Sequence, residues 1–161
     1  FVAGEVFAMT GARQDHVIVS GNIFAALKHH LRGTPCRAYV SDMKLRVETA
    51  DAFFYPDVMV SCHPDDLKNQ RFIEHPTLIV EVLSESTASY DRGEKFVAYR
   101  KLASLKEYLI VDIEARRVEC FRRTADHDWL LHDYVDDIDC TLDSLGICIP
   151  MTDIFEDVEP V

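Results

Sequence analysis

The sequence predicts an α/β (α+β) fold in which helices flank one mixed β-sheet, in two or three layers. Two short runs, 57–62 and 78–83, are almost wholly apolar and contain β-branched residues, as is typical of strands buried on both faces. A segment with helical spacing precedes these runs and another follows them. Short apolar runs separated by polar turns then fill the chain after residue 107, which indicates further strands.

The first half of the chain contains the better-defined elements. Apolar residues recur at mostly helical intervals over 15–31, and Gly33 and Pro35 end that pattern, so we expect a first helix there. Apolar and charged residues alternate over 42–48, which predicts a strand with one face in water. A second helix is expected over 91–102.

The start of this second helix carries a candidate capping box, formed by Asp91 and by Glu94 three residues later. Beyond it, residues 108–111 predict another buried strand. Strands at 117–122 and 129–134 are separated by a polar turn, which predicts a hairpin. A short edge strand is expected at 145–149.

Length and composition indicate one globular domain spanning 1–161, because 161 residues suffice for a single core. All 17 Lys and Arg residues lie in 1–123, so the net charge of -11 comes from an acidic C-terminal segment, 124–161. We expect that segment to face away from any nucleic acid. No apolar run is long enough to span a bilayer, which argues against a membrane partner.

The cysteines are odd in number, widely spaced and without a CxxC pair. We interpret them as reduced thiols in a cytoplasmic protein. The five residues are Cys36, Cys62, Cys120, Cys140 and Cys148.

Two acidic residues lie within the apolar strands. Asp57 follows Pro56 directly, and Glu81 occupies the middle of Leu-Ile-Val-Glu-Val-Leu. Burying an ionised carboxylate without a partner costs several kcal/mol, so such acids need a cation, hydrogen bonds or a catalytic role. If the two strands are neighbours, the carboxylates offer hard oxygen ligands for Mg²⁺ or Mn²⁺. Alternatively, Asp57 caps a turn, and Glu81 forms a buried ion pair or is an inward-turned edge residue.

Lys95 is the third candidate, because it follows Glu81 by only 14 residues and lies in the second predicted helix. If that helix packs over the strand end, Lys95 can reach a metal-bound water or a scissile phosphate. The alternative is an ordinary surface pair with Asp91, four residues earlier.

A succession of short motifs resembles a bacterial family described as putative restriction endonucleases of the PD-(D/E)XK superfamily, once catalogued as a domain of unknown function. The resemblance runs from Gly4 to Pro150. Its motifs are Tyr55-Pro56-Asp57-Val58, then Leu78 to Ser84, then Asp91-Arg92 with Lys95 and Tyr99, and finally Glu107 to Asp112.

This resemblance implies a restriction-endonuclease-like core, a mixed sheet flanked by helices. It also implies a Mg²⁺ or Mn²⁺ ion held by Asp57, Glu81 and the backbone carbonyl of Val82, DNA as the substrate, and a homodimer. The usual lysine position, two residues after the second acid, is Leu83 here. Lys95 matches the family's recurring basic residue and would act from the helix instead.

The leading hypothesis is therefore a metal-dependent endonuclease that hydrolyses DNA phosphodiester bonds. One alternative, prompted by Leu83, is a catalytically impaired nuclease-fold module that binds nucleic acid or protein. Another is a metal hydrolase of a non-nucleic-acid substrate, which the acidic composition permits. His16 can support the site or be an ordinary boundary residue of the first helix. Zinc at Cys62, His63 and His75 is disfavoured, because the spacing matches no zinc finger.

Overall fold

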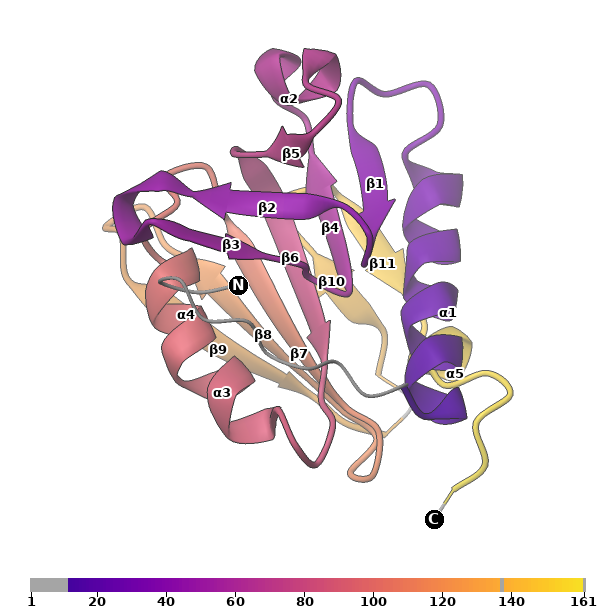
Figure 1. Ribbon diagram of the computed structural model, residues 1–161. Coiled ribbons are helices and arrows are strands. Elements are labelled where there is room, and N and C mark those ends of the chain that lie inside the picture. Colours follow the sequence, from indigo (N-terminus) through magenta and orange to yellow (C-terminus); the bar gives the residue numbers. More distant parts are fainter. Residues whose placement is uncertain (1–11, 137, 161) are drawn as a thin grey trace.

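The computed structural model describes residues 12–136 and 138–160. A six-stranded sheet with the order β1-β4-β6-β7-β8-β9 lies at its centre (Figure 1). Strands β6 and β7 are parallel, and all the remaining pairs of adjacent strands in this sheet are antiparallel. The bounds of the six strands are β1 Arg37–Val40, β4 Val58–Ser61, β6 Pro76–Val82, β7 Glu107–Asp112, β8 Arg117–Arg123 and β9 Trp129–Tyr134.

Two smaller sheets and five short or medium helices complete the described part of the chain. The order of the three-stranded sheet is β3-β2-β5, and β10 pairs with β11. The strand bounds are β2 Lys44–Val47, β3 Ala52–Phe54, β5 Phe72–Ile73, β10 Cys140–Leu142 and β11 Ile147–Ile149. The helices are α1 Gln14–His30, α2 Pro64–Lys68, α3 Ala88–Arg92, α4 Glu94–Tyr99 and α5 Met151–Ile154, with a 3₁₀ turn at Glu48–Ala50.

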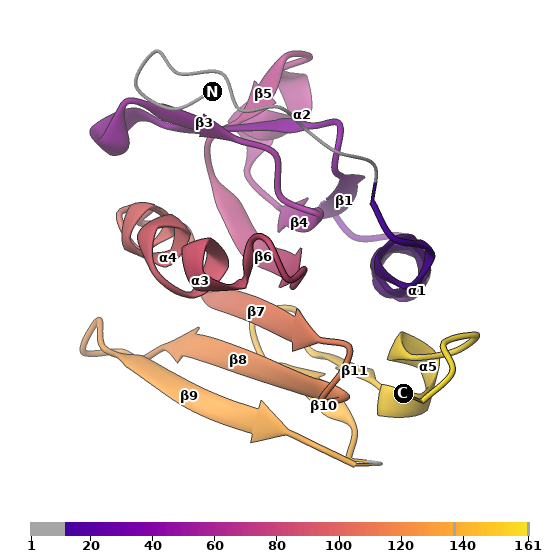
Figure 2. The same cartoon turned by 60° about the horizontal axis from the view of Figure 1, so that its bottom comes forward.

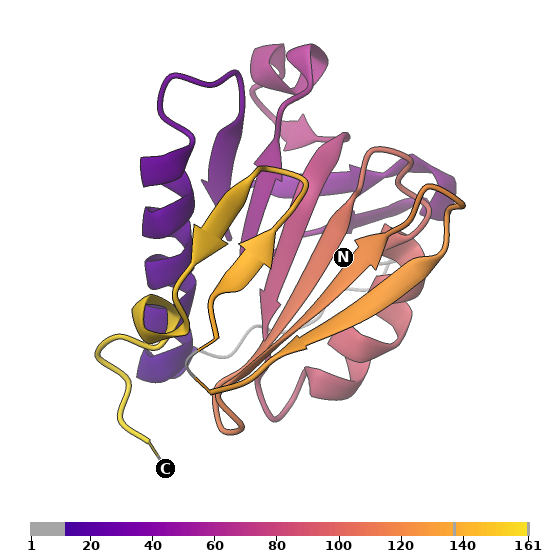
Figure 3. The same ribbon diagram turned by 180° about the vertical axis from the view of Figure 1, so that it is seen from behind.

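The elements form three layers, with the central sheet in the middle. The small β3-β2-β5 sheet and helices α3 and α4 cover one face (Figures 1 and 2). Helix α1, the β10-β11 pair and α5 pack on the other face, as the view from behind shows (Figure 3). The α/β (α+β) prediction, a mixed sheet flanked by helices, is therefore confirmed.

The alternation of side chains along β6 explains how two cores form and which one Glu81 faces. Val80 and Val82 belong to the core beneath α1, whereas Ile79 belongs to the core beneath α4. Because successive side chains in a strand point to opposite faces, Glu81 shares the face of Ile79. The acid is thereby directed toward α4 rather than toward α1.

The prediction of a single second helix over 91–102 is wrong in its bounds and in its continuity. Two helices, α3 and α4, replace it and are separated at Gly93, whose φ and ψ angles are -104° and -96°. The capping-box prediction fails because Asp91 lies inside α3, where it is buried and bonded to other groups. The predicted strand at 145–149 forms β11, but β11 pairs with β10 rather than with the edge of the central sheet.

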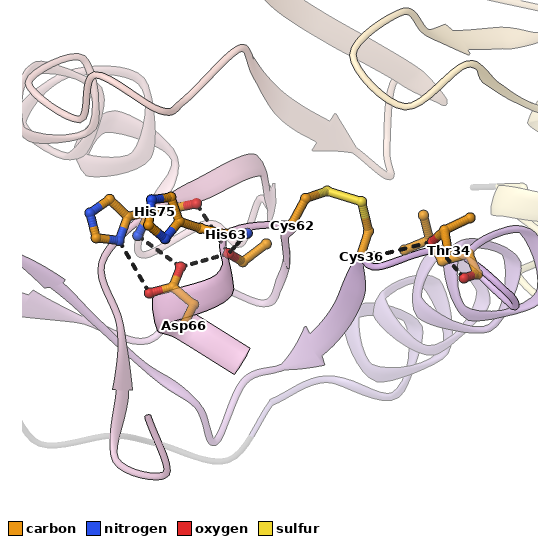
Figure 4. Close-up of a disulfide and its surroundings, with 8 residues drawn as sticks. Thr34, Cys36, Cys62, His63, Asp66 and His75 are labelled. Atoms are coloured by element: carbon orange, nitrogen blue, oxygen red, sulfur yellow. Dashed lines mark hydrogen bonds and ion pairs between the residues drawn. A yellow bond between two sulfur atoms is a disulfide. The ribbon is translucent and has the colours of Figure 1, made fainter. Parts of the chain in front are cut away.

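The reading of all five cysteines as reduced thiols is also wrong, because Cys36 and Cys62 form a disulfide (Figure 4). Arg37 of β1 lies opposite Ser61 of β4, so the two cysteines just beyond this pair face each other, with Cα atoms 4.0 Å apart. A separation of 26 residues hides this contact in the sequence, since strand register decides it. The cytoplasmic location, which was inferred from reduced thiols, stays a prediction.

Asp66 organises the polar residues beside this disulfide (Figure 4). Its carboxylate accepts a hydrogen bond from the Ser61 hydroxyl at 2.6 Å and from the backbone N–H of His75 at 2.9 Å. The rings of His63 and His75 are stacked, with centroids 4.0 Å apart. These contacts give the two histidines and Asp66 a structural role in closing the connection between β4 and β6.

None of the helices described in residues 12–136 and 138–160 has the length and apolar character needed to span a membrane.

Candidate active site

The pairing of β4 with β6 brings the two candidate acids, Asp57 and Glu81, to one end of the central sheet. Val58 lies opposite Val80 in this antiparallel pair, so Asp57, just before β4, reaches the end of β6. The backbone N–H of Val82 donates a 2.8 Å hydrogen bond to Asp57 Oδ2. In Figure 2 this end of β6 lies between α3 and α1. Asp57 and Glu81 therefore lie at the same end of two neighbouring strands, which is the condition under which the sequence offers a shared metal site.

Glu81 is almost completely buried, with 2% of its surface exposed. The Tyr99 hydroxyl donates a 2.7 Å hydrogen bond to Glu81 Oε1, and Lys95 Nζ lies 3.2 Å from the same oxygen. Within the described part of the chain, no donor contacts the second oxygen, Oε2. Glu81 is thus held by α4 through one oxygen and keeps the other for a further partner.

Lys95 lies between two carboxylates. Its Nζ is 3.0 Å from Asp91 Oδ1 as well as 3.2 Å from Glu81 Oε1, and only 15% of its side chain is exposed. The pair with Asp91 exists, but it is buried and not the solvated surface pair considered as the alternative. A buried ammonium shared by two acids is well fixed, because moving it leaves a carboxylate without a counterion.

Asp91 also belongs to the site, although the sequence alone indicates only a helix cap or a surface pair with Lys95 at this position. The Thr87 hydroxyl donates a 3.0 Å hydrogen bond to Asp91 Oδ2, and the Tyr108 hydroxyl donates to its backbone carbonyl at 2.8 Å. A usable signal was present, because Asp91, Lys95 and Tyr99 follow one another at intervals of four residues. That spacing places three polar groups along the side of α3 and α4 that faces Glu81.

His16 joins the site from the first turn of α1. Its Nε2 lies 3.0 Å from the Val82 carbonyl oxygen and 3.4 Å from Asp57 Oδ2. The side chain is 20% exposed, so it lies at the border between the core and solvent. The structure thus places this weaker candidate against both Asp57 and Val82.

The surroundings shift several pKa values. Burial, reinforced by the negative charges of Asp57 and Asp91, raises the pKa of Glu81 to about 8, and the opposing effect of Lys95 is smaller than the burial effect. Burial disfavours the charged form of Lys95, but Glu81 and Asp91 together outweigh it, so the Lys95 pKa is raised. The hydrogen bond to Asp57 raises the pKa of His16 against the opposing effect of burial.

The donor set suits a hydrated divalent cation rather than a cage made only of side chains. Among the residues that the structure describes, no three Asp, Glu, His or Cys side chains are grouped closely enough to enclose a metal ion. Mg²⁺ usually keeps several water molecules and takes only one or two carboxylates from the protein. Asp57, Glu81 and the Val82 carbonyl provide this kind of hard, oxygen-rich set.

Leu83, directly after the end of β6, occupies the position at which the resemblance places a lysine. Its side chain is half-buried and packs against the core beneath α4. The cation that reaches Glu81 comes instead from the helix, as Lys95. The structure therefore places a lysine beside Glu81 although Leu83 is apolar.

The comparisons with known proteins agree with this architecture. Residues 1–150 match the model of the Uma2 family, described as putative restriction endonuclease. Two uncharacterized proteins of Synechocystis sp. are 34% and 35% identical to this chain. The alignment with the first covers 94% of this chain and 80% of that protein, and the alignment with the second covers 81% and 75%.

A solved structure shows the same fold. It is the crystal structure of a putative nuclease of the family DUF820 from Anabaena variabilis, with a TM-score of 0.79 and 13% sequence identity. The match covers 96% of this chain and 87% of that one. The family model covers nearly the whole chain and two relatives exceed 30% identity, so this chain belongs to the Uma2 family of putative restriction endonucleases.

Proposed function

We propose that the chain is a metal-dependent endonuclease that hydrolyses DNA phosphodiester bonds at the end of β6. The observation that carries the proposal is the contact of Lys95 with Glu81, an acid in the middle of a buried strand, beside Asp57 on the neighbouring strand. Two acids at one strand end can hold a divalent ion that activates water, and a lysine beside them can stabilise the charge that develops on a phosphate. Family membership supports DNA as the substrate.

Asp57, Glu81 and the Val82 carbonyl would hold the cation, which is Mg²⁺ or Mn²⁺. When bound, the ion supplies charge neutralisation at the phosphate and lowers the pKa of a water molecule. The chain's own contribution is to position the ligands. The Val82 N–H holds Asp57 through Oδ2, and Tyr99 holds Glu81 through Oε1.

Lys95 supplies the positive charge and N–H donors that stabilise the growing negative charge of the phosphate in the transition state. Its shared contact with Asp91 keeps the ammonium charged and close to the strand end. Because Lys95 acts from α4, the apolar Leu83 does not remove this contribution. The alternative of an impaired binding module therefore gains no support from Leu83.

Isothermal titration with Mn²⁺ tests the site directly. Asp57→Ala and Glu81→Ala should each weaken Mn²⁺ binding strongly, because each removes one charged ligand. Glu114→Gln is the matched control, since Glu114 is an exposed acid in a turn. Mn²⁺ binding that stays undiminished in both alanine variants would overturn the site.

Cleavage of supercoiled plasmid and of single-stranded oligonucleotides, with Mn²⁺ or Mg²⁺ and with EDTA as the blank, tests the reaction. We expect metal-dependent nicking by the wild type and by Glu114→Gln, and none by Asp57→Asn. DNA affinity should also fall steeply with salt, because phosphate contacts release counterions. Tight Mn²⁺ binding without cleavage of any of these DNAs would contradict the proposed reaction and leave the ion site intact.

A further inference from the structure

The ring of His16 contacts two groups that the proposed function assigns to the cation. Its Nε2 is 3.0 Å from the Val82 carbonyl oxygen and 3.4 Å from Asp57 Oδ2. Both oxygens accept hydrogen bonds or bind cations, and the Val82 N–H ties them together through its own 2.8 Å bond to Asp57. A cation bound to His16 Nε2 could therefore also contact the Val82 carbonyl oxygen and Asp57 Oδ2.

The two distances from His16 Nε2 resemble those between neighbouring ligands around a small metal ion. In an octahedral site with metal–ligand distances of about 2.1 Å, adjacent donors lie about 3 Å apart. The distances of 3.0 Å and 3.4 Å from His16 Nε2 are close to that value. His16 Nε2 thus lies at the distance of an adjacent donor from each of the two oxygens.

The scaffold holds the imidazole in this position. His16 lies in the first turn of the 17-residue helix α1. Val19, Ile23 and Leu27, further along this helix, are completely or almost completely buried against the central sheet. A ligand carried by a packed helix is more precisely placed than one carried by a loop.

We propose that His16 is a nitrogen ligand of the divalent cation and gives the site a preference for Mn²⁺ over Mg²⁺. The inference rests on the ion site of the proposed function, in which Asp57, Glu81 and the Val82 carbonyl supply only oxygen. Imidazole nitrogen is a softer ligand than carboxylate or carbonyl oxygen, and it favours transition metals over Mg²⁺. Ion binding needs the Nε2 lone pair, so a protonated ring releases its Nε2 hydrogen to water and keeps the one on Nδ1, whereas a neutral ring exchanges an Nε2 hydrogen, through water, for one on Nδ1.

This ligand set accounts for the absence of a side-chain cage among the described residues. Glu81 is turned toward Lys95 and Tyr99 through Oε1, so it does not join His16 and Asp57 in a closed group. The Val82 carbonyl is the third donor beside His16 and Asp57, and Glu81 remains available to the ion through its second oxygen, Oε2. The contact of His16 with Asp57 and Val82 does not require Glu81 to move.

Electron spin-echo envelope modulation of bound Mn²⁺ tests the inference without any measurement of activity. A nitrogen bound directly to Mn²⁺ produces ¹⁴N modulation, which oxygen ligands do not. We expect this modulation in the wild type and in the control His30→Ala, which changes an exposed histidine of the same helix. It should be lost in His16→Ala and His16→Gln, although glutamine can still donate a hydrogen bond to the Val82 carbonyl.

Affinity measurements give a second readout. Mn²⁺ affinity should fall at least about tenfold in His16→Ala, and Mg²⁺ affinity, measured by competition, should fall less. Mn²⁺ bound to the wild type without ¹⁴N modulation would overturn the inference, as would equal losses for both ions. ¹⁴N modulation in a protein that cleaves no DNA would uphold the inference and contradict the hydrolysis. A wild type that binds no Mn²⁺ would overturn both this ligand and the ion site itself.

Discussion

Lys95 Nζ lies 3.2 Å from Glu81 Oε1, although 14 residues and a change of secondary structure separate the two. The contact exists because β6 directs Glu81 toward the layer that contains α4, and α4 directs Lys95 back toward the strand end. Lys95, on a helix, thus contacts the acid that a lysine at the position of Leu83 would otherwise approach.

Lys95→Met should lower DNA cleavage by about 100-fold or more, because it removes the positive charge that stabilises the phosphate. Mn²⁺ affinity should not fall, since the change removes a cation beside Glu81 rather than a ligand. Cleavage rates and Mn²⁺ titrations on the same samples check both parts. Lys101→Met, which changes an exposed lysine just after α4, is the control and should behave as the wild type. Equal cleavage by Lys95→Met and the wild type would exclude Lys95 from the reaction.

Asp91 should act as a positioning residue for Lys95. Asp91→Asn keeps the size of the side chain but removes the charge that holds the ammonium at 3.0 Å. We expect the kcat for DNA cleavage to fall while the KM for DNA and the Mn²⁺ affinity stay near wild-type values, because Asp91 is not among the proposed ligands of the ion and is buried behind Lys95. Asp91→Glu, which restores the charge, should recover part of kcat. A merely structural role predicts instead a lower melting temperature with no change in kcat for the folded fraction.

The central part of the fold and two of the site acids could be read from the sequence, since both depend on local pattern. The apolar runs around Val58 and Val80 indicate buried strands, and a charged residue inside such a run stands out. By contrast, Gly93 interrupts a pattern that looks like one helix, and Asp91 next to it resembles a cap. The contact of His16 with Val82 spans 66 residues and depends on how α1 packs, which no local pattern encodes.

The disulfide between Cys36 and Cys62 can be tested directly. The sequence alone could not predict it, because the pairing depends on the register of β1 and β4. Thiol titration of the unfolded, unreduced protein should detect three thiols, those of Cys120, Cys140 and Cys148, instead of five. Reduction, or the double change of Cys36 and Cys62 to Ala, should lower the free energy of unfolding by about 2–4 kcal/mol, as expected for closing a loop of this size. Cys148→Ala is the control, because Cys148 is exposed and unpaired in the described structure. Detection of five thiols would show that the pair is reduced.

Glu81 should make the stability of the ion-free protein fall as the pH rises. Its pKa is about 8 in the folded protein, mainly through burial, against an ordinary value of 4.5. The folded state therefore holds this proton more tightly than the unfolded chain does. The resulting stabilisation is complete below about pH 4.5 and is lost as the pH rises through about 8.

Glu81→Gln isolates this effect, because glutamine keeps the shape of the side chain but does not titrate. In EDTA, the free energy of unfolding should fall less between pH 5 and pH 8 for Glu81→Gln than for the wild type. Urea unfolding followed by the fluorescence of Trp129, the only tryptophan, measures it. The raised pKa of His16 acts in the same direction but is present in both proteins, so it largely cancels in the comparison. Parallel pH profiles for the wild type and Glu81→Gln would show that Glu81 is already ionised at pH 5, and that Lys95 and Tyr99 outweigh its burial.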